Sequence, residues 1–268
     1  MARLSLIKVG GGIVENPASL AQLLDEFAKV EGLKVLVHGG GRSATKIAEQ
    51  LGIQQTMIGG RRVTDAETLK VVTMVYAGLV NKNIVAGLQS RGVNALGLSG
   101  ADMNVIQSHK RPLKRVTMED GTEQMVDFGF VGDVDSVDAS ILGDLISLGV
   151  VPVICPIGHD THGTLLNTNA DTIASEVAIA LAQSGFDVKL LYCFEKKGVL
   201  RDADDDESVI PAITSTEFPQ LVEQGIVSGG MLPKLENSFA AISRGVRKVV
   251  ITRHDAISNP ETGTHLTN

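Results

Sequence analysis

Cysteine is scarce in this sequence, and so are long apolar runs. The 268 residues include only two cysteines, Cys155 and Cys193, each inside an apolar stretch, and no signal-peptide pattern opens the chain. Both cysteines are therefore expected to lie reduced in the core of a cytoplasmic protein. No unbroken apolar run reaches the roughly eighteen residues that a membrane-spanning helix needs, so no membrane partner is expected.

Clustered positive charge is also missing. The formal net charge is -7, and the lysines and arginines are scattered along the chain. Binding to nucleic acid or to an anionic membrane needs a clustered basic face, so neither partner is expected. An anionic small molecule would have to be held by a few local groups.

Short β-branched runs alternate with helical patterns along the chain. The first strand, "RLSLIKV", precedes a helix that Asn16 caps, Pro17 begins and Gly32 ends. Later strand-like runs are separated by further helical patterns, and one long helical stretch covers about residues 65 to 91. The alternation predicts an α/β fold with helices on both faces of a mainly parallel sheet. Residues 108 to 134 differ and predict a β-hairpin excursion with a turn at "EDGT".

Two glycine runs follow the first two predicted strands. "VGGG" ends the strand that contains Lys8, and "HGGGR" ends the next one. Ligands bind beyond the carboxyl ends of parallel strands, so the two turns should be neighbours whose backbone N–H groups suit a phosphate. For either run alone, a tight turn is an equally good explanation. Neither run matches G-x-x-x-x-G-K-[ST] or G-x-G-x-x-G, so a phosphate site of another kind is predicted.

Two later helix starts carry more polar groups than a simple cap requires. "LLNTNADTIASEVA" brings together Asn167, Asn169 and Asp171, and "SGGMLPKLENS" places Lys234 in the first turns of a helix. A lysine there opposes the helix dipole and would favour a bound anion. Plain capping and a solvated lysine are the alternative explanations.

No metal site built from protein side chains is predicted. His159 and His162 lack a third ligand, and "DADDDES" lacks the glycine that a calcium loop needs. His38, just before the second glycine run, is expected to make structural hydrogen bonds.

Six segments in order, "IKVGGG", "VHGGG", "GGRRVTD", "VNKNIVAGL", "LNTNADTIAS" and "GGMLPKLENS", resemble the amino-acid kinase family over essentially the whole chain. The resemblance implies a three-layer αβα sandwich with two lobes, an acyl-amino-acid-binding lobe at residues 1 to 165 and a nucleotide-binding lobe at 166 to 268. It is closest to the branch that phosphorylates the γ-carboxylate of N-acetyl-L-glutamate early in arginine biosynthesis. ATP and Mg²⁺ are implied, with Mg²⁺ bridging phosphate oxygens.

The family motifs also imply three catalytic residues. Lys8 would neutralise the transferring phosphoryl group, Lys234 would act from the leaving-group side, and Asp171 would pair with both lysines. A glutamate side chain is already ionised at neutral pH, so no general base is needed, and catalysis would consist of positioning and charge stabilisation.

Binding residues follow from the same motifs. The N–H groups of Gly11 and Gly40 would contact the phosphoryl group, and those of Gly40 and Gly41 the acyl-glutamate. Arg62 matches the arginine that grips the substrate α-carboxylate, for which a planar fork is suited. Asn167 matches the substrate-binding asparagine.

Two departures from the family pattern leave alternatives open. "CFEKKGVL" replaces the usual "TDVxG"-like stretch at the nucleotide site, so nucleotide contacts cannot be transferred there. Arg61 stands where an apolar residue is common, and it is either exposed or a ligand for a longer acyl group such as succinyl. The alternative functions are a kinase for N-succinylglutamate, another family kinase acting on a different carboxylate or on carbamate, and a non-catalytic amino-acid or nucleotide sensor.

The resemblance carries an expectation about assembly as well. Arginine-inhibited members of the family have an additional N-terminal helix that links dimers into hexamers, whereas this chain enters its first strand by about Leu4. A homodimer built through the helix at residues 65 to 91, insensitive to arginine, is expected.

Overall fold

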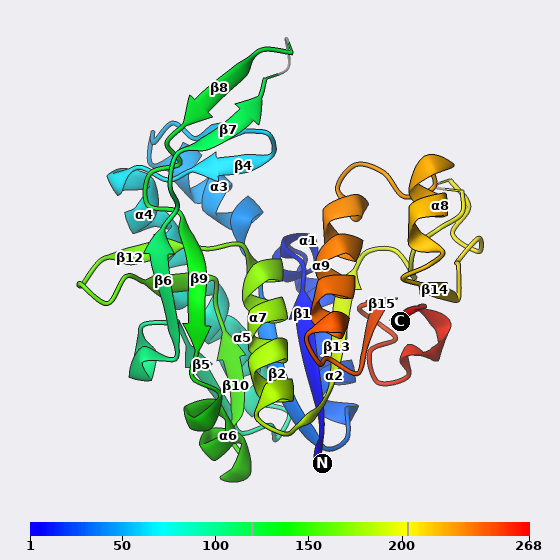
Figure 1. Cartoon of the computed structure of the whole chain (residues 1–268). Helices are drawn as coiled ribbons and strands as arrows, with labels where there is room; N and C mark the ends of the chain where they lie inside the picture. The colour runs from blue at the N-terminus through cyan, green and yellow to red at the C-terminus, as the bar shows by residue number, and fades with distance from the viewer. Residues whose placement is uncertain (119–120, 203) are drawn as a thin grey trace.

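An eight-stranded sheet runs through the whole molecule (Figure 1). The computed structural model describes residues 1–118, 121–202 and 204–268. Neighbouring strands are parallel except for the antiparallel pair β15–β16. In spatial order the strands are β14 (Ala212–Thr214), β16 (Thr264–Thr267), β15 (Lys248–Arg253), β13 (Asp187–Phe194), β1 (Arg3–Val9), β2 (Leu33–His38), β10 (Val151–Ile154) and β5 (Ala95–Leu98). The predicted αβα sandwich with a mainly parallel sheet is confirmed.

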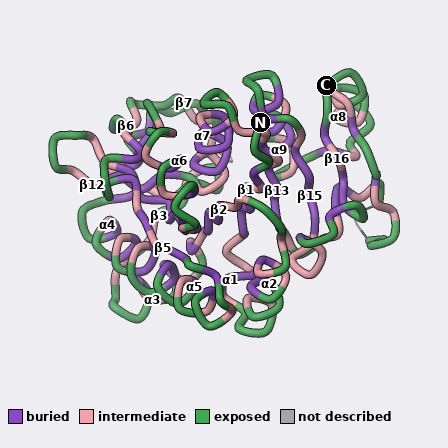
Figure 2. The backbone as a smooth tube through the Cα atoms, turned by 90° about the horizontal axis from the view of Figure 1, so that it is seen from below, coloured by how far each residue is buried: buried purple, intermediate pink, exposed green. Residues whose placement is uncertain are grey.

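Helices cover both faces of this sheet, and Figure 2 shows the two helical layers on opposite sides of the strands. One layer contains α6 (Ala139–Ser147), α7 (Ala170–Gln183) and α9 (Met231–Ser243). The other contains α1 (Gly11–Glu15), α2 (Pro17–Lys29), α3 (Gly41–Gln50), α4 (Ala66–Thr73), the π-helix η1 (Met74–Val80) and α5 (Asn81–Gln89). The short elements are η2 (Asp102–Asn104), α8 (Phe218–Glu223) and η3 (Pro260–Thr262).

The two layers divide the core according to strand alternation. In β1, Leu4 and Leu6 join the hydrophobic cluster under α6, α7 and α9, whereas Ile7 and Val9 join the cluster under α1 to α5. Successive side chains of a strand point to opposite faces. Lys8 is therefore turned to the same face as Leu4 and Leu6.

The first helical region differs slightly from its prediction. Asn16 caps α2 as expected, and its side chain accepts hydrogen bonds from two backbone N–H groups of the first turn. The short helix α1 in front of it was not predicted. The helix ends at Lys29, before Gly32, and Lys34 Nζ donates hydrogen bonds to carbonyls at this end. Gly32 has a φ of +77°, so it forms the turn that follows.

Residues 106–137 leave the main sheet, as the hairpin prediction requires. Two antiparallel pairs are nested here: β6 (Ile106–Lys110) with β9 (Gly132–Val137), and β7 (Lys114–Thr117) with β8 (Glu123–Val126). Two residues of the predicted "EDGT" turn, 119 and 120, lie outside the described residues. A four-stranded sheet adds β11 (Ile157–His159) and β12 (Leu165–Asn167), and a separate hairpin joins β3 (Thr56–Ile58) to β4 (Arg61–Val63).

The long helix predicted near residues 65 to 91 spans Ala66–Gln89 and includes η1 in its middle. By length and composition alone this helix could cross a membrane, although the sequence has no unbroken apolar run of that length. Some 44% of its most apolar window is buried inside the protein. A core helix of a globular protein has the same length and composition, so the helix is weak support for a membrane span.

Both cysteines are free and buried, as predicted. Burial raises the pKa of the Cys155 thiol to about 12 and raises that of Cys193 as well. The boundary predicted between the two lobes, at residues 165 and 166, falls inside β12, and the central sheet continues across it. The division into two lobes stays a prediction.

Candidate active site

A buried lysine–aspartate pair lies at the carboxyl end of β1. Lys8 has a side chain that is 8% exposed, and its Nζ is 2.7 Å from Asp171 Oδ1. Asp171 is held in the first turn of α7, where the cap Asn169 accepts a hydrogen bond from its backbone N–H. A buried charge without a partner is strongly destabilising. The ion pair with Asp171 therefore explains how a charged lysine can be buried in an otherwise apolar strand.

Lys234 packs over the ring of Phe194, which Lys8 also approaches. Its Nζ is 3.8 Å from the centroid of Phe194, and Lys8 Nζ is 5.6 Å from the same centroid. Desolvation lowers the pKa of Lys234; the charge of Asp171 opposes this shift and that of Lys8 adds to it. The predicted ion pair between Asp171 and Lys234 is absent from the described residues, because Lys234 packs on Phe194 instead. Two ammonium groups thus lie near one ring, and Asp171 is paired directly with Lys8.

The two glycine turns are neighbours, as predicted. A Cβ placed on Gly11 would lie 3.8 Å from the backbone nitrogens of both Gly40 and Gly41, and one on Gly39 would lie 3.3 Å from the nitrogen of Gly11. The register Val9↔His38 in the β1–β2 pair aligns the ends of the two strands. Because α1 begins at Gly11 and α3 at Gly41, first-turn N–H groups of both helices have no acceptor within their own helix. The arrangement suits a phosphate group.

Arg62 extends from β4 towards the second glycine turn. Its Nη2 donates hydrogen bonds to the Gly41 carbonyl at 2.9 Å and to Thr45 Oγ1 at 2.8 Å, and its Nη1 donates to Gln55 Oε1. These contacts attach the β3–β4 hairpin to the start of α3. The guanidinium group is therefore held beside the backbone that was predicted to bind the acyl-glutamate.

Asn167 is joined to the residue that follows the same hairpin strand. Its Nδ2 donates a hydrogen bond to Thr64 Oγ1 at 3.0 Å, and both residues are buried. The backbone N–H of Asn167 donates to the carbonyl of Phe130, and the N–H of Phe130 donates to the carbonyl of Thr64. Asn167, at the end of β12, thus contacts Thr64, the residue that follows β4. Thr64 is two residues beyond Arg62 along the chain.

His38 has the structural role that was expected of it. It is fully buried, its Nδ1 donates to the Gly39 carbonyl at 2.8 Å, and its Nε2 accepts from Asn81 Nδ2 at 3.1 Å. Burial lowers the pKa of His38 to about 4, so the ring is neutral near pH 7. With both ring nitrogens occupied, His38 has no free site for accepting a proton from a substrate.

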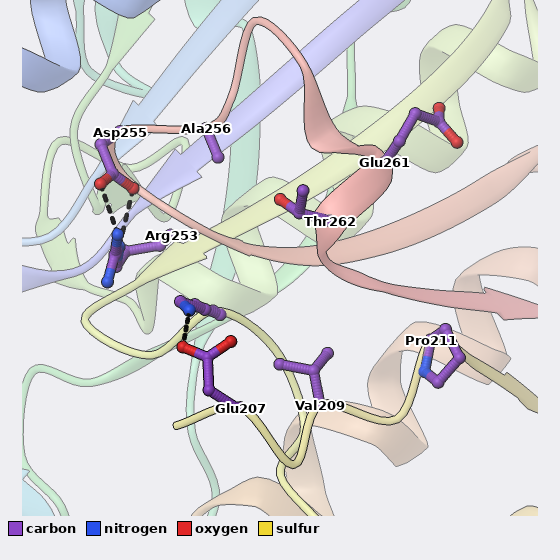
Figure 3. Close-up of a pocket in the computed structure, with 9 residues that line it drawn as sticks. Glu207, Val209, Pro211, Arg253, Asp255, Ala256, Glu261 and Thr262 are labelled. Atoms are coloured by element: carbon purple, nitrogen blue, oxygen red, sulfur yellow. Dashed lines mark hydrogen bonds and ion pairs between the residues drawn. The ribbon is translucent and has the colours of Figure 1, made fainter. Parts of the chain in front are cut away.

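The departing segment "CFEKKGVL" contributes one residue, Lys197, to the lining of a cavity of about 520 Å³, whose other lining residues are labelled in Figure 3. Lys197 lines this cavity and pairs with Glu207, while Arg253 makes two hydrogen bonds of 2.7 Å to Asp255. Outside it, Lys196 pairs with Asp206 at 2.7 Å. The two lysines of the segment are thus neutralised by nearby acidic residues. Glu195, 62% exposed, is turned towards the first glycine turn, where a Cβ on Gly12 would overlap its carboxylate.

Several residues that shape the site were not predicted. Gln55 and Thr45 accept hydrogen bonds from Arg62, Phe194 lies close to both lysines, and Tyr76 packs against Gly40. The family motifs pass close to all four without including them. A tertiary contact made by a single residue leaves no repeated pattern in a sequence.

The site fits a phosphate better than it fits a protein-bound metal ion. Across residues 1–118, 121–202 and 204–268, no group of three histidine, cysteine or acidic side chains is placed to hold a metal. The glycine turns and the two lysines offer N–H and ammonium donors, which match phosphate oxygens. Asp171 is already paired with Lys8, and its charge also acts on Lys234.

A mainly parallel αβα sandwich with paired glycine turns, a buried lysine at the end of β1 and a half-buried lysine on α9 defines a phosphate-handling α/β protein. Comparison with known proteins is more specific. The model of the amino acid kinase family matches residues 3–253, and the chain belongs to that family.

Individual relatives agree with this assignment. The acetylglutamate kinase of Bacteroides thetaiotaomicron is 66% identical over 264 residues, which cover 98% of each chain. The acetylglutamate kinase of Methanopyrus kandleri is 42% identical, covering 95% of this chain and 96% of its own. The crystal structure of smu.665 from Streptococcus mutans superposes with a TM-score of 0.76 at 28% identity, covering 98% of both chains.

Proposed function

We propose that this protein transfers the γ-phosphoryl group of ATP to the γ-carboxylate of N-acetyl-L-glutamate, in arginine biosynthesis. The observation that carries the proposal is the placement of Lys8 and Lys234 over one Phe194 ring, next to two adjoining glycine turns. The identity of the substrate is inferred from acetylglutamate kinases that match 95–98% of the chain at 62–66% identity.

In the proposed reaction, a carboxylate oxygen of the substrate forms a bond to the γ-phosphorus while the bond to the bridging oxygen of ADP breaks. Lys8 would neutralise the moving phosphoryl group, and Lys234 the charge that develops on ADP. Asp171 would keep Lys8 in place. The N–H groups of Gly11 and Gly40 would contact the phosphoryl oxygens. No residue has to remove a proton, because the carboxylate is ionised at neutral pH.

Substrate recognition would come from the neighbouring hairpin and β12. We infer that Arg62 binds the α-carboxylate through its remaining N–H groups, that Gly40 and Gly41 donate backbone hydrogen bonds, and that Asn167 contacts the acyl-amino acid. Mg²⁺ would enter with ATP, held by phosphate oxygens, since this cation keeps few protein ligands in nucleotide sites. We also propose that residues 1–165 bind the acyl-amino acid and 166–268 the nucleotide, and that the enzyme is a cytoplasmic homodimer.

Arg61 offers little support for the N-succinylglutamate alternative. Its side chain is exposed on β4, and the next residue along the strand, Arg62, is the one directed to the glycine turn. Alternation along the strand explains this difference. In this conformation Arg61 is therefore not placed to bind a second carboxylate on a longer acyl group.

The reaction is tested by trapping its product. Acyl phosphates react with hydroxylamine to give hydroxamates, so the enzyme is incubated with Mg-ATP, hydroxylamine and one candidate substrate, with ADP release followed in parallel. The panel contains N-acetyl-L-glutamate, N-succinyl-L-glutamate, free glutamate and carbamate, and Arg61→Leu serves as the matched variant. N-acetyl-L-glutamate is expected to have the highest kcat/KM, with no change in the order of substrates in Arg61→Leu. A preference for the succinyl compound that Arg61→Leu abolishes would assign the longer substrate instead.

A further inference from the structure

Tyr76 forms the support on which the second glycine turn rests. The side chain belongs to η1 and is 5% exposed. A Cβ placed on Gly40 would lie 2.8 Å from Tyr76 Cδ1 and 3.2 Å from its Cε1. The backbone of Gly40 therefore packs directly against the Cδ1–Cε1 edge of the ring. Any side chain at position 40 would displace either the ring or the turn.

The hydroxyl end of the same ring reaches the start of α3. A Cβ on Gly41 would lie 3.8 Å from the Tyr76 hydroxyl oxygen, and the carbonyl of Gly41 accepts the hydrogen bond from Arg62 Nη2. Arg62 also lies near the phenol, because its charge opposes the rise in the pKa of Tyr76 that burial causes. The Tyr76 hydroxyl thus lies beside both the turn and the arginine that bonds to it.

The π-helical geometry of η1 places Tyr76 in this position. Single π-helical turns inside α-helices are uncommon and often occur at functional sites. Immediately after η1, Asn81 hydrogen-bonds to His38, the residue that precedes the glycine turn. The segment from Tyr76 to Asn81 therefore contacts the turn at two points, beneath its glycines and beside its histidine.

We propose that Tyr76 is a positioning residue for the acyl-amino acid. Its ring fixes the position of the Gly40–Gly41 backbone, and its hydroxyl fixes the orientation of the Arg62 guanidinium group. The inference rests on the proposed function of that site. It assigns Tyr76 to the binding of one substrate, because the lysines that face the phosphates are held by Asp171 and Phe194 instead.

Two variants separate the two parts of this role. Tyr76→Phe keeps the ring and removes the hydroxyl, so KM for N-acetyl-L-glutamate should rise about tenfold, as loss of one hydrogen bond to a charged group would produce. Tyr76→Leu also removes the aromatic ring that contacts Gly40, and its KM should rise further. In Tyr76→Phe, kcat and KM for ATP should stay within about twofold of wild type. A purely structural tyrosine would shift both KM values together or only the melting temperature.

A binding measurement gives a readout that is independent of turnover. The chain has no tryptophan and two tyrosines, Tyr76 and Tyr192, so ultraviolet emission excited at the tyrosine band comes from these two residues. Titration with N-acetyl-L-glutamate should change the emission of the wild type and of Tyr192→Phe, but not that of Tyr76→Phe. ATP alone should not produce this Tyr76-dependent change.

The outcomes distinguish this inference from the proposed function. If the wild type forms no hydroxamate from N-acetyl-L-glutamate, the proposed function fails, whatever the tyrosine variants do. If the wild type is active but Tyr76→Phe has an unchanged KM for the acyl-amino acid, the inference about Tyr76 is wrong. An emission change that persists in Tyr76→Phe would also contradict it.

Discussion

At the scale of single residues, Lys8 and Lys234 are the groups on which the proposed chemistry depends. Replacing either by alanine should lower kcat by about 10²- to 10³-fold, the usual loss for a preorganised charge-stabilising donor. The measurement is steady-state turnover with saturating Mg-ATP and N-acetyl-L-glutamate. Lys46→Ala is the matched control, because this lysine is exposed and its own ion pair is with Glu15, at 3.4 Å. Wild-type turnover in either active-site variant would contradict the mechanism.

The Lys8 variant needs a second control, since it leaves Asp171 buried without its partner. Removing one member of a buried ion pair is strongly destabilising, whereas removing both charges is much less so. The double variant Lys8→Met/Asp171→Asn should therefore melt at a higher temperature than Lys8→Ala while its turnover stays low. Recovery of turnover in the double variant would show that Lys8→Ala acts through folding alone.

His38 should make stability depend on pH. Its folded pKa is about 4, against about 6.5 in an unfolded chain, so the unfolded state takes up a proton first as the pH falls. The favourable contribution of the neutral ring is complete above about pH 6.5 and is lost progressively down to pH 4, by about 3 kcal/mol in all. Urea denaturation at pH 7.5 and pH 4.5 measures this loss. His38→Gln should lose less stability between the two pH values than wild type does.

Exposed histidines provide the comparison for that experiment. His162→Gln changes a solvent-exposed side chain and should leave the pH dependence of unfolding as it is in the wild type. If His38→Gln has the same dependence as the wild type, the acid sensitivity belongs to other groups.

The pH dependence of turnover is a separate prediction. Because no general base is invoked, His38 should not cause a fall in kcat on the acidic side of neutrality.

At the scale of elements, the sequence was most informative where a rule of topology applies. Parallel strands end at one edge of a sheet, and this alone predicted that the turns after β1 and β2 would meet. Alternation along β1 likewise explains why Lys8 reaches α7. The roles of Arg62 and Asn167 came from family motifs, because nothing in their local pattern indicates what they bind.

The parts that were missed depend on contacts between distant segments. The π-helical turn of η1 follows a pattern that is indistinguishable from an α-helix in sequence, so neither its geometry nor the position of Tyr76 could be predicted. Lys234 was expected to pair with Asp171, but a lysine on one helix can reach either a carboxylate or an aromatic face, and the sequence does not rank them. The short helix α1 was missed because three consecutive glycines argue against a helix.

The entry into α2 gives a prediction at this scale. Asn16 Oδ1 accepts hydrogen bonds from the N–H groups of Ala18 and Ser19, at 3.0 and 3.1 Å, and α2 packs Leu23 and Phe27 into the core. Asn16→Ala should lower the free energy of unfolding by about 1 kcal/mol, because the cap is lost. Urea denaturation measures the change. Asn16→Asp keeps an acceptor and should stay close to wild type; an equal loss in both variants would show that the cap is not the cause.

At the scale of the whole molecule, the helix at Ala66–Gln89 is both a core element and an exposed surface. Val75 and Tyr76 are buried against the sheet side, whereas Met74 is 56% and Leu79 is 50% exposed. These two apolar side chains are five positions apart, about one turn of a π-helix. Exposed apolar residues grouped on one element are typical of a surface that another protein covers. A second copy of this chain is the partner we expect.

Sedimentation equilibrium should therefore give twice the 28.3 kDa mass of one chain. Two charges at the contact would be desolvated without partners, so the double variant Met74→Asp/Leu79→Asp should dissociate to monomers. Leu148→Asp is the control, because Leu148 is 78% exposed just after α6, in the other helical layer. A hexameric or monomeric wild type would contradict the predicted homodimer. Dissociation by Leu148→Asp, with Met74→Asp/Leu79→Asp remaining dimeric, would place the contact on the α6 side of the molecule instead.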